Sequence, residues 1–134
     1  MSVRSLFTFV TLFLMLGVNA NAEIVKLHCK FLEGTNSTEF QIIKIKNEKD
    51  AFIVLDVKMK KVIDIENLYP VYNLKWSDNL ISWGKQSNGK GTEARSWEVN
   101  LNRFTGKLYS KITFQSYRNF IESYYQCSKA EKKF

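Results

Sequence analysis

The chain has 134 residues, which leaves room for one domain. Its content of 45% hydrophobic and 14% aromatic residues is enough to bury one core. The formal net charge of +7 is spread along the sequence, as on a solvated lysine-rich surface, and favours anionic partners weakly. One histidine and two cysteines are too few ligands for a zinc site, so no metal is predicted.

The first 22 residues have the features of a signal peptide. Arg4 supplies a positive charge, residues 6–16 form an apolar run, and Ala20 and Ala22 fit the small-residue rule for cleavage. The apolar run is too short for a membrane-spanning helix. We therefore expect cleavage before Glu23, a single β-domain at residues 23–134, no stable membrane span, and a periplasmic or secreted location.

The remaining chain reads as a succession of short strands. Apolar and polar residues alternate at 25–31 and 43–46. The mainly apolar runs at 52–57 and 62–65 also predict strands, and the run at 52–57 is the most buried in character. Turns are expected at 34–36, 47–50 and 58–61. An irregular connection is expected at 66–70, where Pro70 cannot donate to a sheet, although a short helix at 64–69 also fits the sequence.

The second half continues the same rhythm, with predicted strands at 72–76, 80–83 and 121–127. Polar breaks recur about every ten residues, and no long segment has helical periodicity. The sequence therefore predicts an all-β fold, a single small antiparallel barrel or sandwich of about eight strands.

The clearest element is a β-hairpin at residues 97–114. Trp97, Val99 and Leu101 alternate with polar residues, and the alternation resumes at Leu108 after a turn at 103–106. Gly106 is the turn residue best suited to a positive φ angle.

Cys29 and Cys127 lie among the apolar positions of the first and last predicted strands. In an exported protein, two such cysteines are expected to form a disulfide. These strands would then be neighbours in the sheet.

The pattern Trp97-x-x-Asn100-x-x-Arg103-x-Thr105-Gly106-x-Leu108, followed by Tyr125-x-Cys127, resembles a signature at the end of many small exported bacterial proteins of unknown function. The resemblance implies a periplasmic β-domain whose disulfide joins its two ends, and it implies no activity. The chain is also similar to periplasmic lysozyme inhibitors, which are small β-barrels with cysteines near both ends. Ser87-Asn88-Gly89-Lys90 does not match their inhibitory loop.

A binding role is the favoured hypothesis. The segment 84–92 is rich in glycine and lysine, and we expect Lys85 and Lys90, with help from Arg95 and Arg103, to bind an anionic envelope component or a protein. The spacing of Gly84, Gly89 and Lys90 matches a phosphate-binding loop, but no Ser or Thr follows the lysine and a strand replaces the helix. Export argues against nucleotides and nucleic acids as partners.

Catalysis has little support in the sequence. His28 has no evident nucleophilic partner, and Asp56, Asp64 and Glu66 are the acids embedded in apolar runs. We therefore predict a non-enzymatic module without a cofactor. Three alternatives stay open: an inhibitor of a cell-wall hydrolase, a lipocalin-like carrier of a small ligand, or a hydrolase that uses Asp and Glu. Of the aromatic residues, Tyr109, Tyr117 and Tyr124 are the most exposed in this interpretation.

Overall fold

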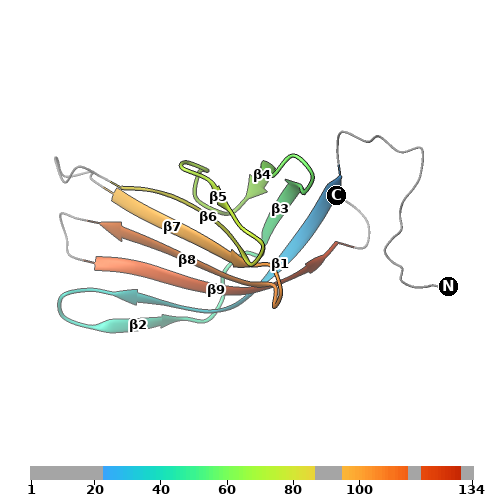
Figure 1. Cartoon of the computed structure of the whole chain (residues 1–134). Helices are drawn as coiled ribbons and strands as arrows, with labels where there is room; N and C mark the ends of the chain where they lie inside the picture. The colour runs from blue at the N-terminus through green and yellow to red at the C-terminus, as the bar shows by residue number, and fades with distance from the viewer. Residues whose placement is uncertain (1–22, 87–94, 115–118, 131–134) are drawn as a thin grey trace.

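The structure is a computed structural model that describes residues 23–86, 95–114 and 119–130. These residues form nine strands and no helix, and every strand pairs antiparallel with its neighbours in one curled sheet, a half-barrel (Figure 1). The predicted all-β antiparallel fold is confirmed. The strands are β1 (Ile24–Ser37), β2 (Ile42–Ile45), β3 (Ala51–Asp56), β4 (Lys61–Glu66), β5 (Lys75–Trp76), β6 (Leu80–Lys85), β7 (Arg95–Asn102), β8 (Lys107–Phe114) and β9 (Asn119–Lys129).

The strand order is β4-β3-β1-β9-β8-β7-β6-β5, and β2 pairs separately with β1. The predicted turn at residues 34–36 is wrong, because β1 continues to Ser37 through a register shift between Phe31 and Glu33. Its first half pairs with β3 and its second half with β2. Gly34 allows β9 to lie close to β1, because a Cβ atom at this position would lie 2.7 Å from the Glu122 carbonyl oxygen of β9.

The disulfide joins the two strands at the ends of the domain, as predicted. Cys29 and Cys127 are directly opposite each other on β1 and β9, and their Cα atoms are 3.8 Å apart. The Cys127 N–H points away from β1 and donates to the carbonyl of Gly106, which directly precedes β8. Cys29 and Cys127 therefore form a non-hydrogen-bonded pair of the β1–β9 ladder. Both side chains belong to the buried core.

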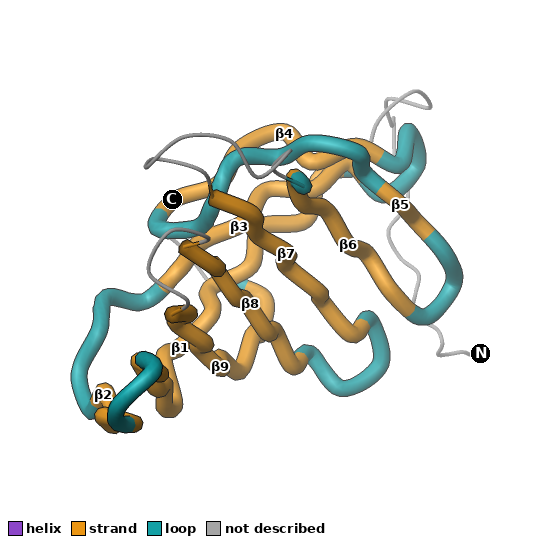
Figure 2. The backbone as a smooth tube through the Cα atoms, turned by 90° about the vertical axis from the view of Figure 1, so that its left-hand side faces the viewer, coloured by secondary structure: helices purple, strands orange, loops and turns teal. Residues whose placement is uncertain are grey.

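The connection between β4 and β5 covers part of the concave face. These two strands are the opposite edges of the sheet, so residues 67–74 must cross from one edge to the other (Figure 2). Two tryptophans of the sheet hold this connection, since Trp83 Nε1 donates to the Tyr69 carbonyl (3.0 Å) and Trp97 Nε1 to the Pro70 carbonyl (2.9 Å). The core therefore lies between the sheet and the connection.

In this region one predicted strand is shorter than expected, and the alternative of a short helix is wrong. The residues predicted as a strand at 72–76 contribute only Lys75 and Trp76 to the sheet, because Asn73 has a left-handed backbone (φ 52°) that interrupts the extended chain. The helix considered at 64–69 does not form. β4 runs to Glu66, and Asn67 ends it with a φ of 63°.

The hairpin of β7 and β8 agrees with the sequence analysis. Gly106 has a φ of 77°, which confirms the predicted positive angle. Asn102 closes the turn, since its side-chain oxygen accepts the N–H groups of Phe104 (2.9 Å) and Thr105 (3.0 Å). This turn is fixed against β9 by the bond from Gln126 Nε2 to the Thr105 carbonyl (2.7 Å).

Candidate functional site

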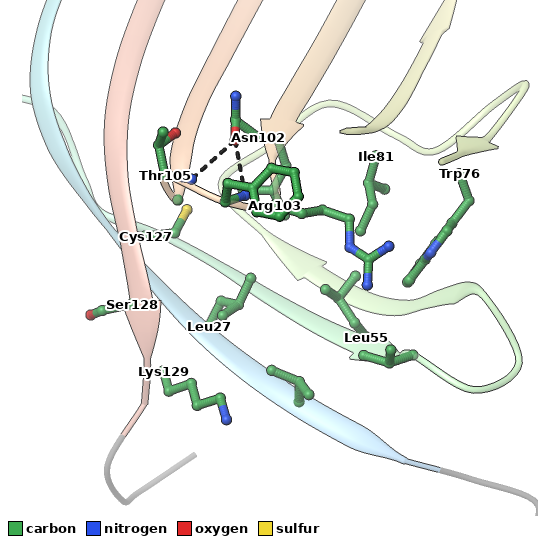
Figure 3. A pocket seen from close by; sticks show the side chains of 15 residues that line it. Leu27, Leu55, Trp76, Ile81, Asn102, Arg103, Thr105, Cys127, Ser128 and Lys129 are labelled. Carbon is green, nitrogen blue, oxygen red and sulfur yellow. Dashed lines mark hydrogen bonds between the residues drawn. The ribbon is translucent and has the colours of Figure 1, made fainter. Parts of the chain in front are cut away.

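A cavity of about 380 Å³ opens on the concave face beside the β7–β8 turn (Figure 3). We call it the Arg103 cavity. Its lining is largely apolar and comes from strands that are far apart in the sequence: Val25 and Leu27 of β1, Leu55 of β3, Ile81 of β6 and Leu101 of β7. Cys127 of the disulfide also lines it. The volume falls in the range of small-ligand sites.

The rim of the Arg103 cavity carries two large apolar side chains, Phe104 and Trp76. Phe104, at the tip of the hairpin turn, is 77% exposed although it is a large apolar side chain. Trp76 lies on the edge strand β5 and is half-buried. Apolar groups of this size at the mouth of an apolar cavity can extend the contact surface of a ligand.

Two cations, Arg103 and Lys129, also line the cavity, and among the residues that the structure describes no acidic one lines it. Arg103 Nη1 donates to the Ser77 carbonyl (2.9 Å), and the guanidinium lies 5.4 Å from the centre of the Trp76 ring. The side chain is thus held in place, and the guanidinium has further N–H groups that can donate to a ligand. Figure 3 shows Leu27 between Arg103 and Lys129. The arrangement favours an anionic group at the mouth of an apolar cavity.

Of the four basic residues predicted to form a binding site, the structure places two at the ends of the same loop. Lys85 ends β6 and Arg95 begins β7, so both adjoin residues 87–94, and Lys90 lies outside the described residues. Arg103 follows the other end of β7, about 25 Å away at the usual rise of a strand, so it does not join this group. Lys85 is engaged with two rings, since its Nζ lies 5.2 Å from the centre of Tyr72 and 5.7 Å from that of Trp97.

Of the three candidate catalytic acids, one accepts hydrogen bonds from the backbone and the other two are exposed on an edge strand. Asp56 accepts the N–H groups of Glu23 (3.2 Å) and Met59 (3.0 Å). The bond from Met59 is the main reason that the pKa of Asp56 is lowered. Asp64 and Glu66 lie on the edge strand β4 and are exposed. Nothing in this arrangement resembles a carboxylate pair that flanks a bound substrate.

His28 lies on the convex face and pairs with Asp50. Its Nε2 is 2.8 Å from Asp50 Oδ2, and its ring stacks on Phe52 at 4.8 Å between centres. The other Asp50 oxygen accepts the Phe31 N–H (3.0 Å), which is the largest cause of the lowered pKa of Asp50. This pair connects β1 to the residue before β3, so its role is to stabilise the fold.

The convex face also carries two of the tyrosines predicted to be exposed. Tyr124 is 40% exposed and packs against Tyr109, with ring centres 5.1 Å apart. Tyr109 is only half-buried, and its hydroxyl donates to Glu122 Oε2 (2.5 Å). Burial, together with this carboxylate, raises the pKa of Tyr109. Tyr117 lies outside the described residues.

Comparisons with protein families, with curated proteins and with solved structures found no significant match. Within residues 23–86, 95–114 and 119–130, no helix has the length and apolar character needed to cross a membrane. In the same residues, no three His, Cys, Asp or Glu side chains converge in a way that could hold a metal ion. The candidate site therefore depends on the geometry of the chain itself.

Sequence reasoning missed the Arg103 cavity. Leu27, Leu55 and Leu101 were recognisable as core positions, but a core position at the end of a curled sheet can face a cavity instead of another side chain. The one available signal was Phe104, a large apolar residue in a turn, where polar residues are usual.

Proposed function

We propose that this chain is an exported, non-enzymatic binding module that holds an amphipathic anion, an acyl chain with a carboxylate head, in the Arg103 cavity. The observation that supports this most directly is the lining of the cavity, which, over the described part of the chain, combines an apolar interior with two cations and no acid. Apolar burial would supply most of the affinity, and the cations would orient the ligand. Of the functions open to the sequence, the lipocalin-like carrier is the one that this geometry favours.

The orientation follows from the positions of the charges. Arg103 and Lys129 stand at the mouth, so the carboxylate would stay near solvent while the chain enters between Leu27 and Ile81. A guanidinium can give a carboxylate two parallel hydrogen bonds, which a lysine cannot. We therefore expect Arg103 to contribute more than Lys129 to the choice of head group.

The test is calorimetric titration of the purified protein with dodecanoate and with dodecanol, its uncharged analogue. The Arg103→Gln/Lys129→Gln variant should bind dodecanoate at least about tenfold more weakly, a change of about 1.4 kcal/mol, and dodecanol with unchanged affinity. Dodecanoate binding should also weaken with salt.

Lys111→Gln is the matched control, because Lys111 lies on the convex face 4.5 Å from the centre of the Phe120 ring. The double variant also loses the bond from Arg103 to the Ser77 carbonyl. The single variant Lys129→Gln keeps this bond and therefore controls for its loss. Equal loss in the Lys111 variant, or no dodecanoate binding by the wild-type protein, would refute the proposal.

A further inference from the structure

A second cavity lies farther along β8 and β9 on the concave face, away from the hairpin turn. It has a volume of about 340 Å³ and is lined by parts of β8, β9, the segment before β3 and the connection that covers the sheet. Its polar lining differs from that of the Arg103 cavity. Four residues with hydroxyl groups contribute to it: Tyr69, Ser110, Ser123 and Tyr125. We call it the hydroxyl cavity.

The two serines interrupt an otherwise apolar face. Ser110 lies between Leu108 and Ile112 on β8, and it is directly opposite Ser123 on β9. The exposed fractions of Ser110 and Ser123 are 3% and 8%, so both are buried polar residues. Both serines line the cavity, together with the phenol-bearing Tyr125 of β9. A hydroxyl in the wall of a cavity can donate a hydrogen bond to a ligand and accept one from it.

The tyrosines keep their hydroxyl groups neutral. Burial is the largest cause of the raised pKa of Tyr69 and of Tyr125, and the carboxylate of Glu48 raises both further. Glu48 therefore acts on both phenols from the rim, where Lys49 also lines the cavity. The cavity thus has one anionic and one cationic residue at its rim and neutral hydroxyls within it.

We propose that the hydroxyl cavity binds a neutral polyhydroxylated molecule of the size of a sugar ring. Each hydroxyl of such a ligand both donates and accepts, which matches serine and tyrosine hydroxyls that do the same. Glu48 accepts and Lys49 donates, so both can bond to sugar hydroxyls as well. The tyrosine rings supply apolar surface for the C–H face of the ligand. An ion would fit less well, because the two rim charges oppose each other.

The experiment is an NMR titration of the oxidised full chain with methyl glucoside, followed through the backbone amides of β8 and β9. Methyl glucuronate and cyclohexanol serve as the charged and the apolar comparison. We expect shifts centred on Ser110 and Ser123 with the glucoside, and at least a tenfold weaker response with either comparison compound.

Ser110→Ala is the decisive variant. It should weaken glucoside binding at least tenfold while the protein still unfolds in one cooperative urea transition, because the substitution removes only the hydroxyl from the cavity wall. Thr113→Ala, on the convex face of the same strand, should leave binding unchanged. The proposal is overturned if Ser110→Ala binds the glucoside like the wild type, if shifts centre on the convex face, or if no shifts occur. Dodecanoate binding is independent of all three outcomes, so it tests the Arg103 cavity separately.

Discussion

Gly106→Ala is the substitution for which the structure predicts the sharpest effect on stability. Alanine would have to keep a φ of 77°, in the left-handed region, at a cost of about 1–2 kcal/mol. Its Cβ would also lie 2.5 Å from the Cys127 carbonyl oxygen, a backbone atom that cannot move without shifting β9. Moving it would weaken the bond from the Cys127 N–H to the Gly106 carbonyl (2.8 Å), worth about 1 kcal/mol. We therefore expect a loss of about 2–3 kcal/mol, the sum of these two costs.

The assay is urea unfolding followed by tryptophan fluorescence with the disulfide intact. Gly106→Asn separates the two costs, because asparagine tolerates a positive φ but brings the same Cβ contact. It should recover part of the loss, not all of it. Thr105→Ala removes only the acceptor for the Lys107 N–H (3.2 Å) and should cost less than about 1 kcal/mol. A Gly106→Ala protein within about 0.5 kcal/mol of the wild type would refute the reasoning.

Three further predictions concern the disulfide, one carboxylate and the basic loop. Replacing Cys29 and Cys127 by serine should lower the free energy of unfolding by about 4–5 kcal/mol, measured with urea, because the bond closes a loop across a separation of 98 residues. The pKa of Asp50 is lower in the folded protein, so its carboxylate stabilises the fold above its unfolded pKa of about 4 and loses that effect as pH falls through the folded value. The difference in urea midpoint between wild type and Asp50→Asn should therefore shrink from pH 7 to pH 3, and a constant difference would contradict this assignment. If the segment 84–92 binds an anionic partner, Lys85→Glu/Lys90→Glu should abolish salt-sensitive capture from envelope extract, whereas unchanged capture would remove the loop from consideration.

The fold was largely predictable because its signals are local. The alternation of apolar and polar residues identifies a strand from the residues of that strand alone. Gly106 indicates the hairpin turn because glycine readily adopts a positive φ angle. The disulfide was predictable because Cys29 and Cys127 each lie on the apolar side of a strand. The errors arose where distant contacts override local preference. Gly34 has the composition of a turn, but it serves the close passage of β9.

The sites were less predictable, because neither cavity is encoded in one segment. Arg103 and Lys129 are 26 positions apart in the sequence and become neighbours of the same cavity through the order of β7, β8 and β9. Ser110 and Ser123 looked like ordinary small residues in strands until their cross-strand pairing placed them opposite each other. A cavity forms where no side chain of the folded protein occupies the space, and the alternation of apolar and polar residues does not predict where that happens.

Both cavities follow from one feature of the topology. Because β4 and β5 are the two edges of the sheet, the chain between them must span the concave face, and residues 67–74 are too few to cover all of it. Trp83 of β6 and Trp97 of β7 hold this segment against the concave face through the carbonyls of Tyr69 and Pro70. The apolar, cationic cavity lies beside the hairpin turn, while the hydroxyl cavity is lined by the connection itself through Tyr69. A change that loosens the connection should therefore disturb the hydroxyl cavity more than the Arg103 cavity, which lets the two binding activities be separated within one domain.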